Sequence, residues 1–362
     1  MNFTLIKGCY YVIGYSPDGD SIKFKADNPA LWDTLITEFR EELNESLAED
    51  NGIVTLRLQG IDAFETHYTP ETPTPPKGFK AEPRASIKKP DPGNHKQPKR
   101  IAIEATNVFM NLLGVEEATW KSWGKNSWVN KITLRRGDST VELSEKHADA
   151  IPGYIVTNDA EKKGRPIAWV FPGTTSLPDG TMLSTEELAA MLDQSANYHL
   201  LRQGVVYPYF FMTLPAKLRQ KMADAAQKAQ RDAARRITRL KGKPVPDTLS
   251  NLWLYDQTVN GIDIDDLKHI TEDFGIYPYL FRRIIKHWYA TQMQRYWNAL
   301  ISGDEDKAQY DQRLDLSEFF EGSNPYVFII SDQDFVRLSQ IVVIEGRRLT
   351  LRKYPFDIVF LS

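Results

Sequence analysis

The chain has 362 residues, of which 41% are hydrophobic and 26% are charged. This is the composition of an ordinary globular protein, and it excludes a collagen-like or disordered chain. The single cysteine, Cys9, excludes an intramolecular disulfide and a cysteine-based zinc site. The sequence has no apolar run of about 18 residues and no basic leader before an apolar stretch. We therefore expect no membrane contact, no signal peptide and a cytoplasmic location.

Charge is unevenly distributed along the chain, although the net charge is only −3. Residues 217–243 contain ten Lys and Arg against two Asp, whereas residues 256–362 contain twelve basic and seventeen acidic residues. The length suits two or three domains, and the charge asymmetry predicts parts with different roles. We expect one domain over residues 1–256 and a C-terminal α+β module over residues 257–362. The module would serve regulation, homo-oligomerisation or binding of a protein partner.

The first predicted elements are a β-hairpin, a helix and a strand. Apolar and polar residues alternate over 3–25, around turn signals at 14 and 16–19. Leucine and phenylalanine recur every fourth residue within 29–49, which predicts a short helix. An Asn-Gly turn then leads into a strand over 53–61.

A Pro-rich segment interrupts this pattern. Residues 69–98 hold eight of the 21 prolines and are mildly basic. Because proline blocks both helix and sheet hydrogen bonding, we expect an extended, mobile loop. A helix over about 101–113 should follow and end at Gly114, and residues 118–171 look mostly β.

Helices are expected next, before strands return. Ser-Thr-Glu-Glu at 184–187 is a capping box that opens a helix ending at Gly204. An apolar stripe predicts a second helix over about 215–241, with basic residues on the rest of its surface. An aromatic-rich amphipathic helix is predicted around 281–289. Strands are predicted after it at 326–330, 336–344, 349–352 and 356–361.

Three short segments carry candidate functional residues. The first is Asp-Gly-Asp-Ser at 18–21, in the predicted hairpin turn. The second, 56–67, spans the end of a strand and the start of the Pro-rich loop, and the third, 159–165, precedes another strand. Side chains at strand ends can converge on a ligand without being packed into the core.

The residue types in these segments suit metal-assisted hydrolysis of a phosphodiester. Asp20 and Asp62 can share a hard cation, Ca²⁺ or Mg²⁺, because such ions prefer oxygen ligands. Arg57 and Arg165 can each fork onto two phosphate oxygens and neutralise charge that develops in the transition state. Glu65 is a further carboxylate that can take a proton from an attacking water.

Together these segments resemble the staphylococcal (micrococcal) nuclease, or thermonuclease, family. The resemblance covers roughly residues 8–256 and rests on five motifs in the family's order. They are Asp-Gly-Asp-Ser, Arg-x₄-Asp-x-x-Glu-Thr, Gly-Arg before a strand, Leu-Leu-Arg-Gln-Gly ending a helix, and a basic helix leading to Asn-Leu-Trp at 251–253.

The resemblance implies an α+β fold built on a five-stranded OB-type β-barrel with three helices. It implies a Ca²⁺-dependent endonuclease that hydrolyses DNA and RNA and leaves 3′-phosphate ends. The implied roles are Ca²⁺ ligation by Asp20, Asp62 and the Ala63 carbonyl, general-base catalysis or water orientation by Glu65, a phosphate clamp of Arg57 and Arg165, contact of Lys162 and Lys163 with a neighbouring phosphate, and base stacking by the candidates Tyr207 and Tyr209.

The chain also departs from the family pattern. Where the family reads Asp-Thr-Pro-Glu-Thr, residues 62–66 read Asp-Ala-Phe-Glu-Thr. A hydroxyl and a loop-stiffening proline are lost, while the carbonyl expected to bind Ca²⁺ is kept. The segments at about 26–51, 68–98 and 114–150 are insertions relative to the family, and the residues from 257 onward have no counterpart there.

Other interpretations remain open on the sequence alone. Taken singly, Asp20 can be a turn residue, Arg57 an ion-pair partner on a strand face, and Glu65 a loop carboxylate without a role. The basic residues over 217–243 are better explained as a solvated helix surface than as a nucleic-acid groove. The rival function is a catalytically weak or inactive OB-fold module that binds nucleic acid or protein. A toxin delivered by a dedicated machine is a third interpretation.

An unselective nuclease that stays in its cell requires restraint. We expect that restraint from metal supply, from assembly or from the C-terminal module, since weak Ca²⁺ sites are poorly filled at cytosolic concentrations. Destruction of foreign nucleic acid, such as phage DNA, would give the restraint a purpose.

Overall fold

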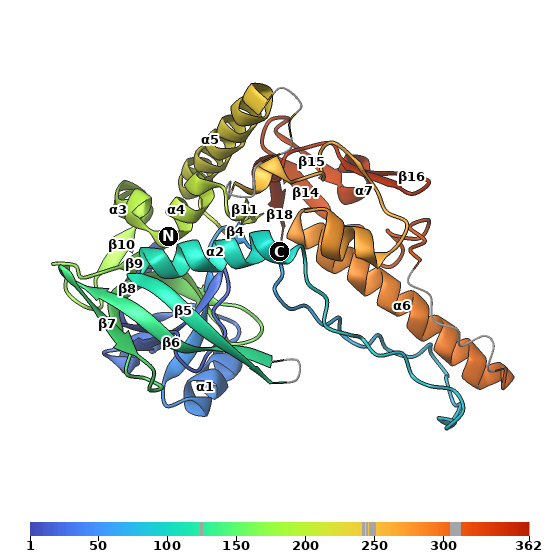
Figure 1. Ribbon diagram of the computed structural model, residues 1–362, viewed down its shortest axis with the longest axis horizontal. Coiled ribbons are helices and arrows are strands. Elements are labelled where there is room, and N and C mark those ends of the chain that lie inside the picture. The colour runs from blue at the N-terminus through green and yellow to red at the C-terminus, as the bar shows by residue number, and fades with distance from the viewer. Residues whose placement is uncertain (124–125, 241–242, 244, 246–250, 305–312, 362) are drawn as a thin grey trace. The chain divides into compact units, whose positions relative to one another are not determined.

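The computed structural model describes residues 1–123, 126–240, 243, 245, 251–304 and 313–361 (Figure 1). They form two compact units. The first unit consists of 1–63, 100–254 and 355–362, and the second consists of 64–99 and 255–354. This division differs from the expected boundary after residue 256, because the Pro-rich segment groups with residues 255–354, and residues 355–362 group with the first unit.

The first unit contains a closed five-stranded β-barrel. Its strands follow the order β1-β2-β3-β9-β8, and β8 pairs back onto β1 to close it. Only the β3–β9 pairing is parallel among these five. A closed barrel with helices confirms the expected α+β class and is consistent with an OB-type barrel. The strands are β1 (Asn2–Tyr11), β2 (Ser21–Ala26), β3 (Ile53–Leu58), β8 (Ile151–Ala160) and β9 (Pro166–Pro172), and β10 (Met182–Ser184) extends the sheet beside β1.

The helices expected over 101–113 and 215–241 begin and end near the predicted residues, whereas the one expected within 29–49 is a 3₁₀-helix followed by a separate α-helix. The capping box is present, since the Ser184 Oγ accepts from the Glu187 amide at 3.2 Å. The helix that it opens stops early, because Ser195 caps a new one, so 184–204 contains two α-helices where one was expected. Gly204 ends the second in a left-handed conformation, as expected. The helices are η1 (Pro29–Thr34), α1 (Arg40–Glu49), α2 (Lys99–Leu112), α3 (Thr185–Met191), η2 (Leu192–Gln194), α4 (Ala196–Gln203), α5 (Ala216–Leu240), η3 (Leu252–Leu254) and η6 (Pro355–Asp357).

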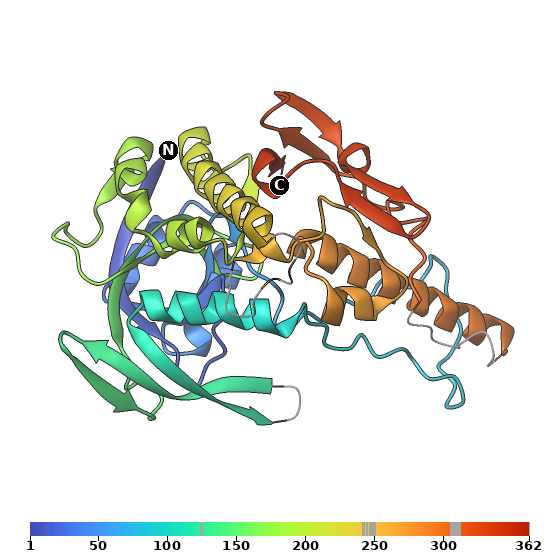
Figure 2. The same cartoon turned by 45° about the horizontal axis from the view of Figure 1, so that its top comes forward.

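Three smaller sets of strands complete the first unit. A meander of β5, β6 and β7 lies in the region predicted to be mostly β, and Figure 2 shows it below α2. The strand expected over 53–61 is interrupted, so that β4 is separate from β3 and pairs with β11. The last strand, β18, runs parallel to β12, which explains why the chain's end belongs to this unit. The bounds are β4 (Ile61–Asp62), β5 (Val115–Trp123), β6 (Asn126–Arg136), β7 (Ser139–Leu143), β11 (Tyr207–Pro208), β12 (Phe210–Phe211) and β18 (Ile358–Phe360).

The second unit is built around α6 (Pro278–Ser302), which is longer than the predicted aromatic helix. Both Figure 1 and Figure 2 show the extended residues 64–99 following α6. Ile87 is buried there against Tyr289, Met293 and Trp297 of that helix. The Pro-rich segment is therefore extended, as expected, but it is a packed part of this unit.

Short strands and two short helices are the other regular elements described in the second unit. The strand expected over 336–344 is divided into two strands by a helical turn. No helix in the described parts of either unit is long and apolar enough to cross a membrane. The remaining elements are β13 (Ile262–Asp263), the π-helix η4 (His269–Asp273), β14 (Tyr326–Ile329), β15 (Asp334–Arg337), α7 (Leu338–Ile341), β16 (Val342–Glu345) and β17 (Arg348–Leu351).

Candidate functional site

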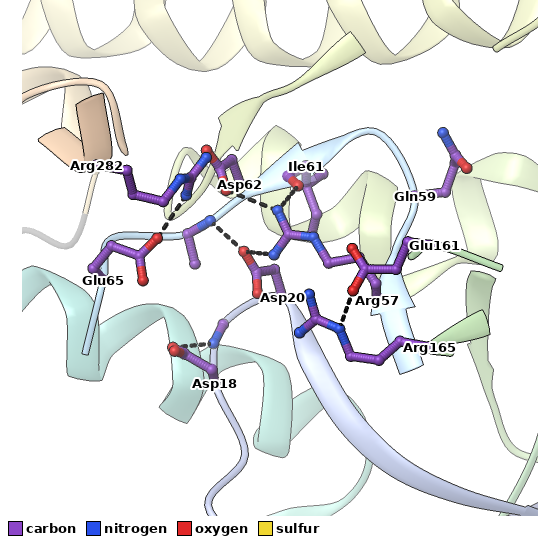
Figure 3. A network of polar contacts seen from close by, with 12 residues as sticks. Asp18, Asp20, Arg57, Gln59, Ile61, Asp62, Glu65, Glu161, Arg165 and Arg282 are labelled. Carbon is purple, nitrogen blue, oxygen red and sulfur yellow. Dashed lines mark hydrogen bonds and ion pairs between the residues drawn. The ribbon is translucent and has the colours of Figure 1, made fainter. Parts of the chain in front are cut away.

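Arg57 joins two buried aspartates in the first unit (Figure 3). Its Nη1 forms an ion pair with the Asp20 carboxylate, and its Nη2 lies 2.8 Å from Asp62 Oδ1. Nη2 also donates to the Ile61 carbonyl at 3.3 Å. Asp62 is fully buried and Asp20 is 7% exposed, so the one guanidinium neutralises two carboxylates that are shielded from water. The three charged residues come from two of the three predicted segments.

Strand pairing brings these side chains together. Asp20 directly precedes β2, and the next residue, Ser21, is the register partner of Arg57 on β3. The Asp20 carbonyl also accepts from the Leu58 amide at 2.9 Å. Asp62 ends β4, where its register partner on β11 is Tyr207. Both aspartates are therefore held by backbone pairing, which positions their carboxylates before any ligand binds.

The oxygen atoms of Asp20 and Asp62 are of the kind that bind a hard cation. The Asp20 Oδ2 that faces Arg57 also accepts from the Ala63 amide at 2.8 Å, so Ala63 lies beside this aspartate, and ligation by its carbonyl stays a prediction. Two carboxylates and a nearby backbone carbonyl are the oxygen donors that Ca²⁺ uses. Within the described ranges, no group of three or more His, Cys, Asp or Glu side chains is arranged to hold a metal. Ca²⁺ would therefore need carbonyl and water oxygens in addition to Asp20 and Asp62. It would also compete with Arg57 for the two carboxylates.

Arg165 lies at the start of the strand next to Arg57. Ile167 on β9 is the register partner of Arg57 on β3, and Arg165 precedes it by two residues. The Arg165 Nε forms an ion pair with Glu161, four residues earlier (Figure 3). The second expected arginine therefore lies beside the neighbouring strand, where it pairs with a carboxylate of its own turn.

The turn that holds Arg165 depends on a glycine. Gly164 has a φ of +69°, and a Cβ at this position would overlap the Glu42 carbonyl of α1. Only glycine meets both conditions without strain, which explains the Gly-Arg pair noted in the sequence. Lys162 and Lys163 are exposed on the same turn, where an extended anion can reach them.

Glu65 belongs to the second unit rather than the first. Its carboxylate Oε1 lies 2.6 Å from Nη1 of Arg282 on α6 (Figure 3). Its amide donates to the side chain of Gln97 at 3.2 Å, and its carbonyl accepts from the Gln97 amide at 2.9 Å. The candidate base is thus part of the unit that contains residues 255–354, although it follows Asp62 by three positions in the chain.

The two candidate tyrosines have different surroundings. Tyr207 is fully buried, and its ring packs against Trp253 with the centroids 5.2 Å apart. This burial corrects the expectation that Tyr207 stacks on a base, because its ring is part of the core and its strand supports Asp62. Tyr209 is half-buried beside Phe211 and Phe360, and base stacking by its ring stays a prediction.

Sequence reasoning missed two side chains that hold neighbouring segments in place, one in each unit. Asn197 on α4 is fully buried, accepts from the Val170 amide at 2.9 Å and donates to the Gln59 carbonyl at 2.9 Å. It thereby ties the end of β3 to β9. The signal was available, because Asn197 shares the apolar face of its helix with Leu200 and Leu201. Arg282 gave no such signal, since only tertiary folding brings it to Glu65.

Comparisons with known proteins add no family assignment. No family model matches the chain, and no curated protein matches it either.

Proposed function

We propose that this protein is a Ca²⁺-dependent nuclease of the staphylococcal nuclease type, which hydrolyses phosphodiester bonds in DNA or RNA and leaves 3′-phosphate ends. The observation that carries the proposal is the Asp20–Arg57–Asp62 cluster beside the closed barrel. Two buried acids around one guanidinium are costly to maintain for stability alone, because hydrophobic residues of similar volume stabilise a core equally well. Their presence favours a role in binding a cation and a phosphate.

Each residue of the cluster has a role in this proposal. Asp20 and Asp62 would hold the ion, with the Ala63 carbonyl as a further ligand. Bound Ca²⁺ would supply charge that neutralises the phosphate and positions a water. Arg57, whose guanidinium already donates through both terminal nitrogens, would fork onto the phosphate when the aspartates hold the ion. When substrate and ion bind, the two aspartates would thus exchange Arg57 for the ion, and Arg57 would exchange the aspartates for the phosphate.

The other proposed roles rest on the motif order in the sequence. Arg165 would be the second arm of the phosphate clamp, released from Glu161 by the more highly charged substrate. Lys162 and Lys163 would contact a neighbouring phosphate. Glu65 would accept a proton from the attacking water or orient it.

The experiment is a plasmid-cleavage assay with Ca²⁺, with EDTA, and with the Glu65→Gln variant. We expect cleavage with Ca²⁺ only, 3′-phosphate ends, and a loss of about 10²–10⁴-fold in rate for Glu65→Gln. Glu71→Gln is the matched control, because Glu71 is an exposed carboxylate of the same segment. Cleavage that survives EDTA would contradict the metal mechanism, and cleavage that is unaffected by Glu65→Gln would contradict the role of Glu65.

A second candidate is a non-catalytic module that binds nucleic acid. The observation in its favour is that Arg57 already balances both aspartates, an arrangement that is stable without any metal. In that case fluorescence anisotropy would show that the chain binds an oligonucleotide, and no divalent cation would produce cleavage.

A further inference from the structure

The side chain of Glu65 is held by the C-terminal part of the chain. Arg282 lies 217 positions away in sequence, near the N-terminal end of α6, yet its Nη1 is 2.6 Å from Glu65 Oε1. The Glu65 and Arg282 side chains are 17% and 23% exposed, so the pair is largely shielded from water. A charge-assisted hydrogen bond of this length is among the stronger contacts that a carboxylate makes.

The backbone of Glu65 is held by the same unit. Gln97 is fully buried and bonds both the amide and the carbonyl of Glu65. The Gln97 Nε2 in turn donates to the Ile276 carbonyl at 2.7 Å, two residues before α6 begins. This buried amide therefore links the Glu65 backbone to the segment that leads into the helix carrying Arg282.

Residues on both sides of Glu65 are anchored as well. Phe64 is 1% exposed, and a Cβ added to Gly275 would lie 2.8 Å from the Phe64 Cζ, so the ring packs directly on that glycine. The Tyr68 ring meets Phe281 of α6 edge-on, with the centroids 6.4 Å apart. Phe64 stands where the nuclease family has proline, and here burial of its ring restrains the loop that a proline would stiffen.

We propose that Arg282 is a positioning residue for Glu65, so that the C-terminal part of the chain is required for catalysis rather than appended to it. The inference rests on the proposed function. A glutamate side chain has three rotatable bonds, and the backbone contacts leave them unrestrained. The ion pair with Arg282 selects one arrangement of the carboxylate, and misplacing such a group by about 1 Å can cost about 10²-fold in rate.

The test measures plasmid cleavage and thermal unfolding of the full chain for Arg282→Gln, Arg282→Lys, Glu65→Gln and the Arg282→Gln/Glu65→Gln double variant. We expect Arg282→Gln to lower kcat about 10- to 100-fold with little change in KM, and Arg282→Lys to recover part of the loss. In the Glu65→Gln background, Arg282→Gln should have no further effect on kcat. The melting-temperature shifts of the two single variants should be non-additive, because the residues are in contact.

Lys286→Gln is the matched control, since Lys286 is exposed on the same helix and carries the same charge. It should leave both kcat and melting temperature close to those of the unmodified chain. The inference would be overturned by an equal kcat loss from Arg282→Gln in both backgrounds, by additive melting-temperature shifts, or by a faster Arg282→Gln enzyme. Each of these results would leave the proposed function intact. An unmodified chain that never cleaves would instead reject the proposed function, and the catalytic role of Arg282 with it.

Discussion

Ser21 on β2 and Arg57 on β3 are register partners, and this pairing places the preceding residue, Asp20, against the Arg57 guanidinium. The same guanidinium reaches Asp62 after the chain has left β3 and entered β4. Arg57 therefore neutralises two aspartates that are 42 positions apart in the sequence.

We predict that Arg57→Gln strongly destabilises the protein in the absence of Ca²⁺. The substitution leaves two shielded carboxylates without their cation, which should lower the free energy of unfolding by about 3–5 kcal/mol. Urea unfolding measures this change. The control is Arg135→Gln, which removes an exposed ion pair with Glu116 and should cost less than about 1 kcal/mol. Similar losses for both variants would contradict the shielded role of the Arg57 cluster.

We also predict that Ca²⁺ and Arg57 compete for the same aspartates. Calorimetry should show tighter Ca²⁺ binding by Arg57→Gln than by the unmodified chain, although this variant cleaves nucleic acid more slowly. At a Ca²⁺ concentration 100 times its Kd, the gain in stability should be about 2.7 kcal/mol. Asp62→Asn should lose that gain, whereas the exposed Asp138→Asn should keep it. Weaker Ca²⁺ binding by Arg57→Gln would exclude competition.

The turn before Arg165 gives a prediction about backbone strain. Gly164 and Gly137 both have positive φ, at +69° and +63°, but only Gly164 has backbone atoms where a Cβ would go. Gly137→Ala should cost about 1–2 kcal/mol, the ordinary penalty for a left-handed non-glycine residue. Gly164→Ala should cost clearly more, because the turn must also move away from α1. Denaturant unfolding compares the two, and equal costs would show that the contact with Glu42 is unimportant.

Asp149 provides a prediction about pH. It is fully buried, and burial raises its pKa, against the lowering effect of hydrogen bonds from the Val12 and Ile13 amides. A folded-state pKa above the unfolded value of about 3.9 means that Asp149 contributes stability below about pH 4 and loses it as pH rises through the folded pKa.

Asp149→Asn removes this titration while keeping an oxygen that can accept from the same two amides. The variant should gain stability over the unmodified chain as pH rises from about 4 to 7, by about 1.4 kcal/mol for each unit by which the pKa is raised. Unfolding free energies measured across this range test the sign. A difference that shrinks with rising pH would show that the carboxylate is favoured in its charged form.

Much of the candidate site could be predicted before the structure. Asp20, Arg57 and Asp62 were found because their motif spacing is local and because strand ends and tight turns have recognisable residue patterns. The β-barrel was expected from the family resemblance, and its closure by β1–β8 pairing agrees with it. The burial of Tyr207 was missed, since the sequence of a two-residue strand does not show whether its ring faces solvent or Trp253.

By itself, the sequence determined the composition class, the capping box at Ser184, the extended course of the Pro-rich segment and the residue types of the candidate site. These features depend on neighbours within a few positions, so local patterns are enough to identify them. Only the tertiary structure decided that residues 64–99 pack with the C-terminal part of the chain and that Arg282 holds Glu65. Such contacts form because burying Phe64 and Ile87 favours particular partners in space, and partners more than 200 residues apart leave no periodicity in the sequence.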